Sequence, residues 1–275
     1  MKKIYFLTSE LIPFCETYSL SKLSRKLTNI FHEDPDYDIR LAQPKYGFIS
    51  ERKYILREVI RLKDIPIQFN NEDQLVNMKS AFIPETRVQV YFVQDDNYFK
   101  PLPELLYKAK NGRVYKENGE RFAFFSRVSL SALKNLFWAP DVIMCNDWQM
   151  SFVPALIKQQ YHKDDFYKNI KTMFVLHTID DYRYFPNEAY KMLGLKPPTS
   201  GKTQDNLKFA MENADMVLLV DNEKNELMEK LEKDKELKKV FDSNPLNSVL
   251  NINSSAKSSD WREAAKALGS ILLDF

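Results

Sequence analysis

Six short apolar segments divide the chain, and each is five to six residues long and nearly continuous rather than alternating. They consist mostly of β-branched, leucine, methionine and aromatic residues. Continuous runs of this length are typical of strands buried on both faces of a parallel sheet. The pattern predicts strands at Lys3–Thr8, Asp38–Ala42, Val88–Val93, Asp141–Cys145, Thr172–Leu176 and Met216–Val220.

Longer stretches with helical spacing lie between these strands. They predict helices at Leu20–Phe31, Arg121–Leu136, Gln149–Gln160, Asp205–Asn213 and Glu223–Phe241. Repeated strand-then-helix order implies right-handed crossovers, so we expect an α/β protein with a doubly wound, parallel, Rossmann-like sheet. The ligand crevice of such a sheet lies at the carboxyl ends of the strands. Candidate site residues should therefore follow strands, as do Ser9–Ser19, Asn146–Gln149 and His177–Tyr184.

The chain divides into one large domain and a short tail. We expect residues 1–242 to form the Rossmann-like domain, with an inserted hairpin within the less regular segment Lys45–Ala81. Residues 243–259 are rich in Ser and Asn, which predicts a polar linker. Residues 260–275 predict a helix whose apolar residues form one stripe that can pack back on the domain. The stripe consists of Trp261, Ala264, Ala265, Leu268, Ile271 and Leu272.

Composition excludes several classes of protein. The 275 residues are 44% hydrophobic, and 40 Lys and Arg against 38 Asp and Glu leave a net charge of only +2, so we expect no nucleic-acid partner. The apolar start is broken by Glu10 and Pro13 far short of a signal peptide or a membrane span. Cys15 and Cys145 cannot build a disulfide framework, which favours the cytoplasm.

The sequence also contains little that indicates a cofactor site or a metal site. The chain has only 6 glycines, and no two are closer than seven positions, so a P-loop and a G-x-G-x-x-G turn are both absent. Adjacent aspartates such as Asp95-Asp96 and Asp180-Asp181 have no His or third carboxylate beside them in sequence, and such pairs are common in turns. We therefore expect no cofactor and no metal.

Several motifs occur in a fixed order over roughly residues 1 to 220. They are Ser9-Glu10 with Pro13-Phe14, Pro44 to Gly47, Glu120 to Arg127, Asn146 to Gln149, and His177 through Phe185-Pro186. In order and spacing they resemble the N-terminal half of bacterial glycogen and starch synthases. The resemblance implies the two-Rossmann (GT-B) glycosyltransferase fold, in which this half contacts the glucan acceptor and the other half holds ADP-glucose. It also implies that the family reaction is glucosyl transfer from ADP-glucose to an α-1,4-glucan.

The chain departs from this family at the loop that contacts the donor diphosphate. Where the family has Lys-Thr-Gly-Gly-Leu, this sequence has Glu16, Thr17, Tyr18, Ser19 and Leu20, a degenerate nucleotide-sugar loop. A carboxylate repels a phosphate by about 4 kcal/mol per contact at 4 Å if the effective dielectric constant is near 20. Tyr18 and Ser19 also fill the space that two glycines leave open for the backbone to approach a phosphate.

The resemblance implies roles for four further residues, and each has a structural alternative. Asp147 and His177 would contact the transferred sugar as catalytic residues, and Trp148 and Gln149 would bind substrate. Asp147 could instead cap the helix that starts near Gln149, and His177 could be a neutral histidine hydrogen-bonded beneath a loop. Trp148 is more often a core residue than a platform on which a sugar stacks.

The resemblance does not extend to the family's donor-binding half. Beyond residue 200 the chain has one arginine, Arg262, and no two glutamates eight positions apart, whereas the last helix from Asp260 to Ala265 resembles the family's crossover helix. We therefore expect a glycogen or starch synthase-like protein that is incomplete as a standalone transferase. Its partners would be an α-glucan or nucleotide sugar, and a second protein or a homodimer. The alternative is a non-catalytic carbohydrate- or partner-binding module.

Overall fold

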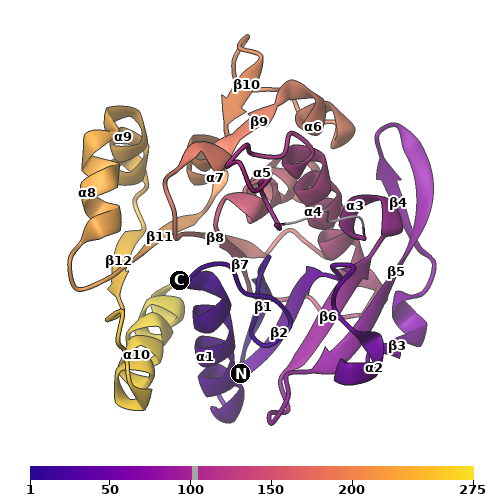
Figure 1. Ribbon diagram of the computed structural model, residues 1–275, viewed down its shortest axis with the longest axis horizontal. Coiled ribbons are helices and arrows are strands. Elements are labelled where there is room, and N and C mark those ends of the chain that lie inside the picture. Colours follow the sequence, from indigo (N-terminus) through magenta and orange to yellow (C-terminus); the bar gives the residue numbers. More distant parts are fainter. Residues whose placement is uncertain (101–104) are drawn as a thin grey trace.

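The computed structural model describes residues 1–100 and 105–275, and a ten-stranded sheet forms its centre (Figure 1). The strand order is β12-β11-β8-β7-β1-β2-β6-β5-β3, and β4 pairs with β5. The strands from β12 to β6 are all parallel. Their bounds are β1 Lys2–Leu7, β2 Tyr37–Pro44, β6 Gln89–Gln94, β7 Val142–Asn146, β8 Lys171–Leu176, β11 Met216–Asp221 and β12 Asn247–Asn251.

The six predicted strands correspond to β1, β2, β6, β7, β8 and β11, so the expected parallel α/β sheet is confirmed. Their residues are almost entirely buried, because helices cover both faces of the sheet. The principal helices are α1 Leu20–Glu33, α4 Asn118–Asn135, α5 Phe152–Leu156, α6 Asn187–Met192, α7 Asn206–Asn213, α8 Glu226–Lys233, α9 Lys235–Ser243 and α10 Ser258–Asp274.

The less regular segment before β6 contains the expected hairpin. Strands β4 Ile65–Phe69 and β5 Glu72–Phe82 pair in antiparallel register, and Asn70 and Asn71 between them both have positive φ. Asparagine tolerates this backbone region better than most residues, which suits a two-residue turn. Short elements complete this side of the fold: α2 Glu51–Tyr54, β3 Arg57–Glu58, η1 Ile60–Leu62 and α3 Asp96–Phe99.

Two predicted helices differ from the structure. The segment predicted as one helix at Glu223–Phe241 is two helices, α8 and α9, because Asp234 leaves helical geometry and its side chain accepts a hydrogen bond from the Leu237 N–H. The segment Gln149–Gln160 is three pieces: a 3-10 turn η2 at Trp148–Met150, then α5, then a π-helical turn η3 at Ile157–Tyr161.

The segment predicted as a polar linker contains an additional strand. β12 extends the sheet in parallel register from the pair Val217–Asn247 to the pair Asp221–Asn251. The prediction missed it because an edge strand needs few apolar residues, and only Leu250 of its five residues is buried. Residues 243–259 are therefore not a free tether.

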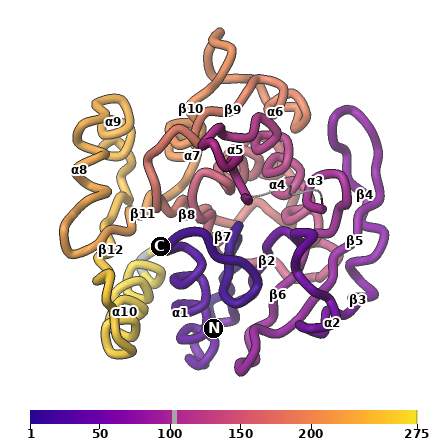
Figure 2. Tube along the Cα trace, in the orientation of Figure 1, coloured from indigo at the N-terminus to yellow at the C-terminus, as the bar shows by residue number. Residues whose placement is uncertain are grey.

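The last helix, α10, lies beside α1 (Figures 1 and 2). It begins at Ser258, two positions before the predicted start, and it contacts both α1 and β12. The predicted apolar stripe faces inward, since Trp261, Leu268 and Leu272 are at least 95% buried. No helix within residues 1–100 and 105–275 is both long enough and apolar enough to cross a bilayer.

Candidate functional site at the carboxyl edge of the sheet

Three loops that follow adjacent parallel strands meet at the carboxyl edge of the sheet. They follow β1, β7 and β8, which are neighbours in the strand order. Asp147 lies where they meet, directly after β7 and completely buried. The site is therefore built around a carboxylate that the surrounding loops enclose.

The carboxylate of Asp147 accepts four hydrogen bonds. Oδ1 accepts from the backbone N–H groups of His177 at 3.3 Å and Thr178 at 3.1 Å, which fixes the loop after β8. Oδ2 accepts from the Thr178 hydroxyl at 2.8 Å and from the Tyr18 hydroxyl at 2.9 Å, which reaches it from the loop after β1. Asp147 thus joins all three loops.

The backbone of Asp147 lies in a region that residues with side chains rarely occupy. Its φ is 64° and its ψ is −175°, a combination that is essentially restricted to glycine and costs of order 1–3 kcal/mol. Its side chain makes no hydrogen bond to the first turn of the following helix. Asp147 therefore does not cap this helix with its side chain, because the carboxylate points to the neighbouring loops instead.

Burial dominates the electrostatics of Asp147. Desolvation of the charged form raises the pKa of Asp147 to about 7, although the hydrogen bonds from Thr178 and Tyr18 act in the opposite direction. The carboxyl group therefore changes protonation near neutral pH. A group of this kind at the end of a buried strand is typical of functional sites.

A second buried carboxylate, Glu10, holds the loop after β1. Its oxygens accept hydrogen bonds from the N–H and the hydroxyl of Thr17, and Oε1 also accepts from the Tyr107 hydroxyl at 2.7 Å. Burial raises the pKa of Glu10 as well. Because Thr17 is anchored in this way, the next residue, Tyr18, is directed toward Asp147.

His177 follows β8 and lines a pocket at the carboxyl edge of the sheet. Its Nε2 lies 3.1 Å from the Asn146 side-chain oxygen, which can only accept a hydrogen bond, so this nitrogen is the donor. Desolvation lowers the pKa of His177 to about 3, and the imidazole is neutral at physiological pH. A neutral histidine here can exchange hydrogen bonds with a sugar hydroxyl but supplies no positive charge.

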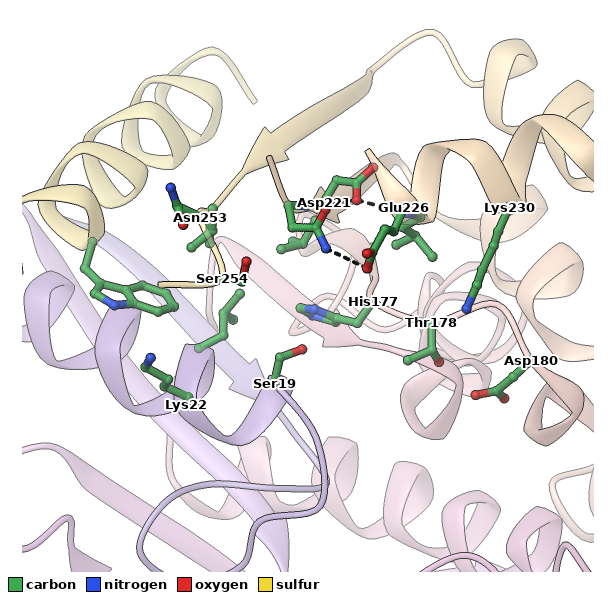
Figure 3. A pocket seen from close by; sticks show the side chains of 16 residues that line it. Ser19, Lys22, His177, Thr178, Asp180, Asp221, Glu226, Lys230, Asn253 and Ser254 are labelled. Atoms are coloured by element: carbon green, nitrogen blue, oxygen red, sulfur yellow. Dashed lines mark hydrogen bonds between the residues drawn. The ribbon is translucent and has the colours of Figure 1, made fainter. Parts of the chain in front are cut away.

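The pocket has a volume of about 300 Å³ and lies at the carboxyl ends of β8, β11 and β12 (Figure 3). The start of α1 and the side chain of Trp261 in α10 also border it. Most of its lining groups are hydroxyls, amides, carboxylates and amines. These polar residues are Ser19, Lys22, His177, Thr178, Asp180, Asp221, Asn222, Glu226, Lys230, Asn253 and Ser254.

The charges around this pocket do not favour a polyanion. Three carboxylates line it, from Asp180, Asp221 and Glu226, against two amines, from Lys22 and Lys230. The Lys22 amine lies 5.9 Å from the centre of the Trp261 ring. The excess of one carboxylate makes neutral polar ligands better suited to the pocket than a diphosphate.

Comparison with known proteins supports the same fold. The sequence profile of the family described as the starch synthase catalytic domain matches residues 3–243, most of the chain. The chain belongs to this family. Glycogen synthase of Chlorobium luteolum is 31% identical over 221 residues, which cover 78% of this chain and 45% of that protein. Glycogen synthase of Pelodictyon phaeoclathratiforme is 31% identical over 191 residues, which cover 70% of this chain and 39% of that protein.

A solved structure agrees with the fold. The catalytic domain of starch synthase IV from Arabidopsis thaliana, bound to ADP and acarbose, superimposes with a TM-score of 0.73 at 18% identity. The match covers 90% of this chain and 51% of that one. The chain therefore spans less than half the length of the glycogen synthases and about half of the starch synthase structure.

The degenerate loop of this starch synthase family member is partly exposed. Glu16 and Thr17 are exposed at the surface, and Glu16 does not line the pocket, whereas Ser19 does. The Glu16 side chain therefore lies outside this pocket. Tyr18 of the same loop contacts Asp147, and Ser19 is exposed.

Trp148 and Gln149 are enclosed rather than open to a substrate. Trp148 is 2% exposed, and the ring of Tyr182 stacks on it at 5.4 Å between centroids, so the face that a sugar would need is covered. Gln149 is fully buried and donates from its side chain to the Tyr18 hydroxyl at 3.1 Å. Both residues are thus enclosed by neighbouring loops in this structure, in line with the core alternative for Trp148, and direct substrate binding by them stays a prediction.

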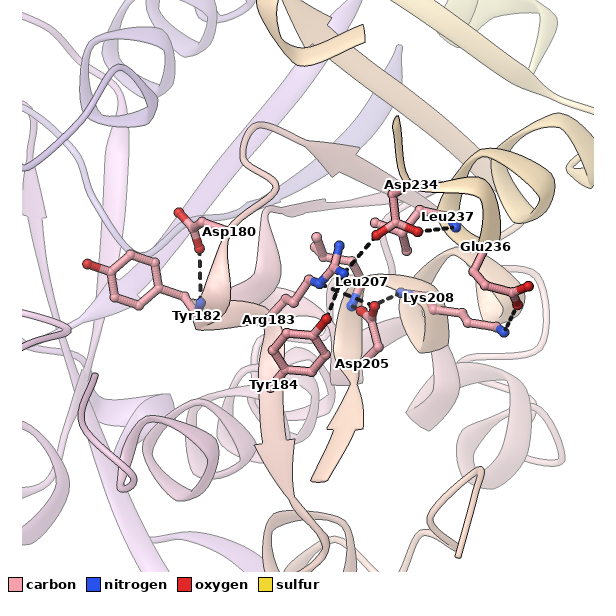
Figure 4. A network of polar contacts seen from close by, with 10 residues as sticks. All are labelled: Asp180, Tyr182, Arg183, Tyr184, Asp205, Leu207, Lys208, Asp234, Glu236 and Leu237. Carbon is pink, nitrogen blue, oxygen red and sulfur yellow. Dashed lines mark hydrogen bonds and ion pairs between the residues drawn. The ribbon is translucent and has the colours of Figure 1, made fainter. Parts of the chain in front are cut away.

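Arg183, within the candidate segment His177–Tyr184, fixes the loop after β8, a role that its neighbours in sequence do not indicate. Arg183 lies 3.3 Å from the Asp205 carboxylate and 2.8 Å from the Asp234 carboxylate, and it donates to the Tyr184 hydroxyl (Figure 4). Asp205 also caps α7 and Asp234 caps α9. Arg183 therefore ties the loop to the beginnings of two helices. The partners lie far apart in sequence, so no local pattern could reveal them.

The described residues contain no group of three or more His, Cys, Asp or Glu side chains placed to hold a metal ion. The polar groups that line the pocket are carboxylates, amines, amides, hydroxyls and one neutral imidazole.

Proposed function

We propose that this chain is the acceptor-side half of a glucosyl-transfer centre and binds an α-glucan in the pocket at the carboxyl edge. The observation that carries the proposal is the pocket itself, in a member of the starch synthase catalytic domain family. Sugar hydroxyls both donate and accept hydrogen bonds, and the lining amides, hydroxyls and imidazole offer both capacities. Leu23 and Trp261 also line the pocket with apolar atoms, although each side chain is at least 95% buried.

Several lining groups remain open to a ligand while others are engaged within the protein. Asp221 accepts hydrogen bonds from the N–H groups of Asn222, Leu227 and Met228, so its carboxylate holds the start of α8. The imidazole of His177, by contrast, borders the pocket and has one ring nitrogen engaged by Asn146. We propose that His177 is the principal sugar contact.

Transfer of glucose from ADP-glucose needs groups that the residues of this chain do not provide. A transferase without a metal depends on cations that stabilise the departing diphosphate, an electrostatic effect often worth several kcal/mol. The pocket carries an excess of carboxylates, and the loop after β1 has Glu16 in place of the family's lysine. We propose that a donor-binding half from outside these residues completes the reaction.

Calorimetry with maltoheptaose, ADP and ADP-glucose tests this proposal. We expect the chain to bind maltoheptaose, to bind ADP and ADP-glucose more weakly, and to transfer no glucose at rates near 1 per second. His177→Ala should weaken glucan binding at least about tenfold, which corresponds to 1.4 kcal/mol. His162→Ala is the matched control, because His162 is exposed and does not line the pocket. Tighter binding of ADP than of the glucan would contradict the proposal.

We also propose that the protein works in the cytoplasm. Its two cysteines, Cys15 and Cys145, are free and buried, as suits a reducing compartment. Labelling of both thiols in protein unfolded directly after isolation would support this placement, and finding them oxidised would contradict it.

A further inference from the structure

Tyr18 occupies the last hydrogen-bonding position of the Asp147 carboxylate. Each carboxylate oxygen has about two lone-pair directions, and all four are used by His177, Thr178 and Tyr18. Three of these bonds come from the loop after β8. Only the bond from Tyr18, at 2.9 Å, comes from the loop that departs from the family pattern.

Neither Tyr18 nor Asp147 lines the pocket, but both contact residues that do or lie next to one in sequence. Asp147 is completely buried and does not line the pocket, although Ser19 and Thr178 do. Ser19 is the next residue after Tyr18, and Thr178 is the other hydroxyl donor to the same oxygen. Oδ2 of Asp147 is therefore covered by two hydroxyls, one from the lining residue Thr178 and one from Tyr18, which precedes the lining residue Ser19.

We infer that Tyr18 closes Asp147 off from the pocket, so that a ligand bound there cannot hydrogen-bond to this carboxylate. Tyr18 is thus a specificity-determining residue of the proposed glucan site. The choice of a glucan as ligand rests on the proposed function, whereas the closure itself does not.

Hydrogen bonds to Tyr18 and to the residue before it keep Tyr18 in the closed position. Its hydroxyl donates to Asp147 and accepts from the Gln149 amide at 3.1 Å. The preceding residue, Thr17, is fixed by the buried Glu10 carboxylate. Burial and two nearby carboxylates raise the pKa of Tyr18 well above its ordinary value, so the hydroxyl keeps its proton and remains a donor.

Two substitutions of Tyr18 should move the titration of Asp147 in opposite directions. Tyr18→Phe keeps the ring that closes the site but removes a hydrogen bond to the charged form, so the pKa of Asp147 should rise by about 1. Tyr18→Ala admits water to the carboxylate and removes much of its desolvation, so the pKa of Asp147 should fall. NMR titration of 13C-labelled aspartate carboxyls in the full chain measures both. A Tyr18→Ala protein that remains folded with an unchanged or higher Asp147 pKa would overturn the inference.

Glucan binding provides the second readout. Tyr18→Ala frees Oδ2 for a sugar hydroxyl, and we expect maltoheptaose to bind at least about tenfold more tightly. Adding Asp147→Asn should cancel this gain, because the charged acceptor is lost. Tyr54→Phe is the control: Tyr54 donates one hydrogen bond, to the Pro13 carbonyl at 2.7 Å, away from the pocket. It should change neither readout.

The outcomes separate this inference from the proposed function. If wild type binds maltoheptaose but a folded Tyr18→Ala protein binds it no more tightly, Tyr18 does not restrict access and the inference is wrong. If neither wild type nor any variant binds maltoheptaose, the proposed glucan function fails. In that case the titration of Asp147 still tests whether Tyr18 closes off this carboxylate. Opposite changes of the Asp147 pKa in Tyr18→Phe and Tyr18→Ala support the closure, and equal changes refute it.

Discussion

Two acidic residues follow neighbouring parallel strands at the same edge of the sheet, and they have opposite surroundings. Asp147 follows β7, is fully buried and accepts four hydrogen bonds. Glu16 lies in the loop after β1, is exposed, and among the described residues receives no hydrogen bond on its carboxylate. A carboxylate thus holds three loops together at Asp147, whereas the carboxylate of Glu16 is exposed to solvent.

The two sequence motifs that contain these residues also differ in burial. Residues Asn146 to Gln149 match the family motif, and all four are at least 98% buried with partners on other loops. Glu16, Tyr18 and Ser19 depart from the family motif, and two of the three, Glu16 and Ser19, are exposed. A substitution among enclosed partners leaves several polar groups unsatisfied, whereas an exposed position tolerates a change of charge.

The strongest test of the comparison removes the buried carboxylate. Asp147→Ala leaves the N–H groups of His177 and Thr178 and two hydroxyls without their acceptor, so we expect a loss of about 3 kcal/mol or more in the free energy of unfolding. Asp147→Gly removes the same carboxylate but suits the φ of 64°. It should therefore be about 1 kcal/mol more stable than Asp147→Ala. Urea unfolding measures both values.

Equal stabilities of the two variants would show that the backbone of Asp147 is not strained. A loss below about 1 kcal/mol in Asp147→Ala would show that the four hydrogen bonds contribute little. Either result would mean that the buried carboxylate of Asp147 does not differ from the exposed carboxylate of Glu16 in the way described above.

The pH dependence of stability sharpens the comparison further. The pKa of Asp147 is raised to about 7 in the folded state, from an ordinary value near 3.8, so between these values the folded protein binds more protons than the unfolded chain. Stability should therefore fall as pH rises from about 4 to 7. The contribution of Asp147 over this window is at most about 4 kcal/mol.

Asp147→Asn isolates this contribution from those of other groups. Glu10 and Asp205 also have raised pKa values and change stability in the same direction, whereas His177, with a lowered pKa, acts oppositely below about pH 6.5. Urea midpoints of both proteins between pH 5 and 8 should show a steeper decline for wild type. Parallel curves would mean that Asp147 does not titrate in this range.

The sequence predicted the parallel sheet because its strands are buried on both faces and therefore apolar throughout. It missed β12, since Asn247–Asn251 is an edge strand with one buried side chain. The sequence-based prediction also placed one helix where the structure has α8 and α9. Charged residues continue across Asp234, and the break between the two helices depends on the side-chain cap of Asp234.

The residues of the site could be selected from sequence, but their contacts could not. Asp147, His177 and Tyr18 were all singled out by motif. The hydrogen bond from Tyr18 to Asp147 joins residues 129 positions apart and depends on how the two loops are folded. Trp148 likewise matched the family motif, but only the structure shows that Tyr182 covers its face.

The smallest expected effect is that of Glu16. Glu16→Gln removes the charge and keeps the size of an exposed side chain, so the free energy of unfolding should change by less than about 0.5 kcal/mol. Its charge can act on an anion in the pocket only through solvent, where salt screens it beyond about 10 Å at 0.1 M. We therefore expect a slight gain in ADP affinity at low salt that disappears at 0.5 M. A gain of tenfold or more that persists at high salt would show that Glu16 approaches the ligand directly, and its carboxylate would then belong to the site as Asp147 does.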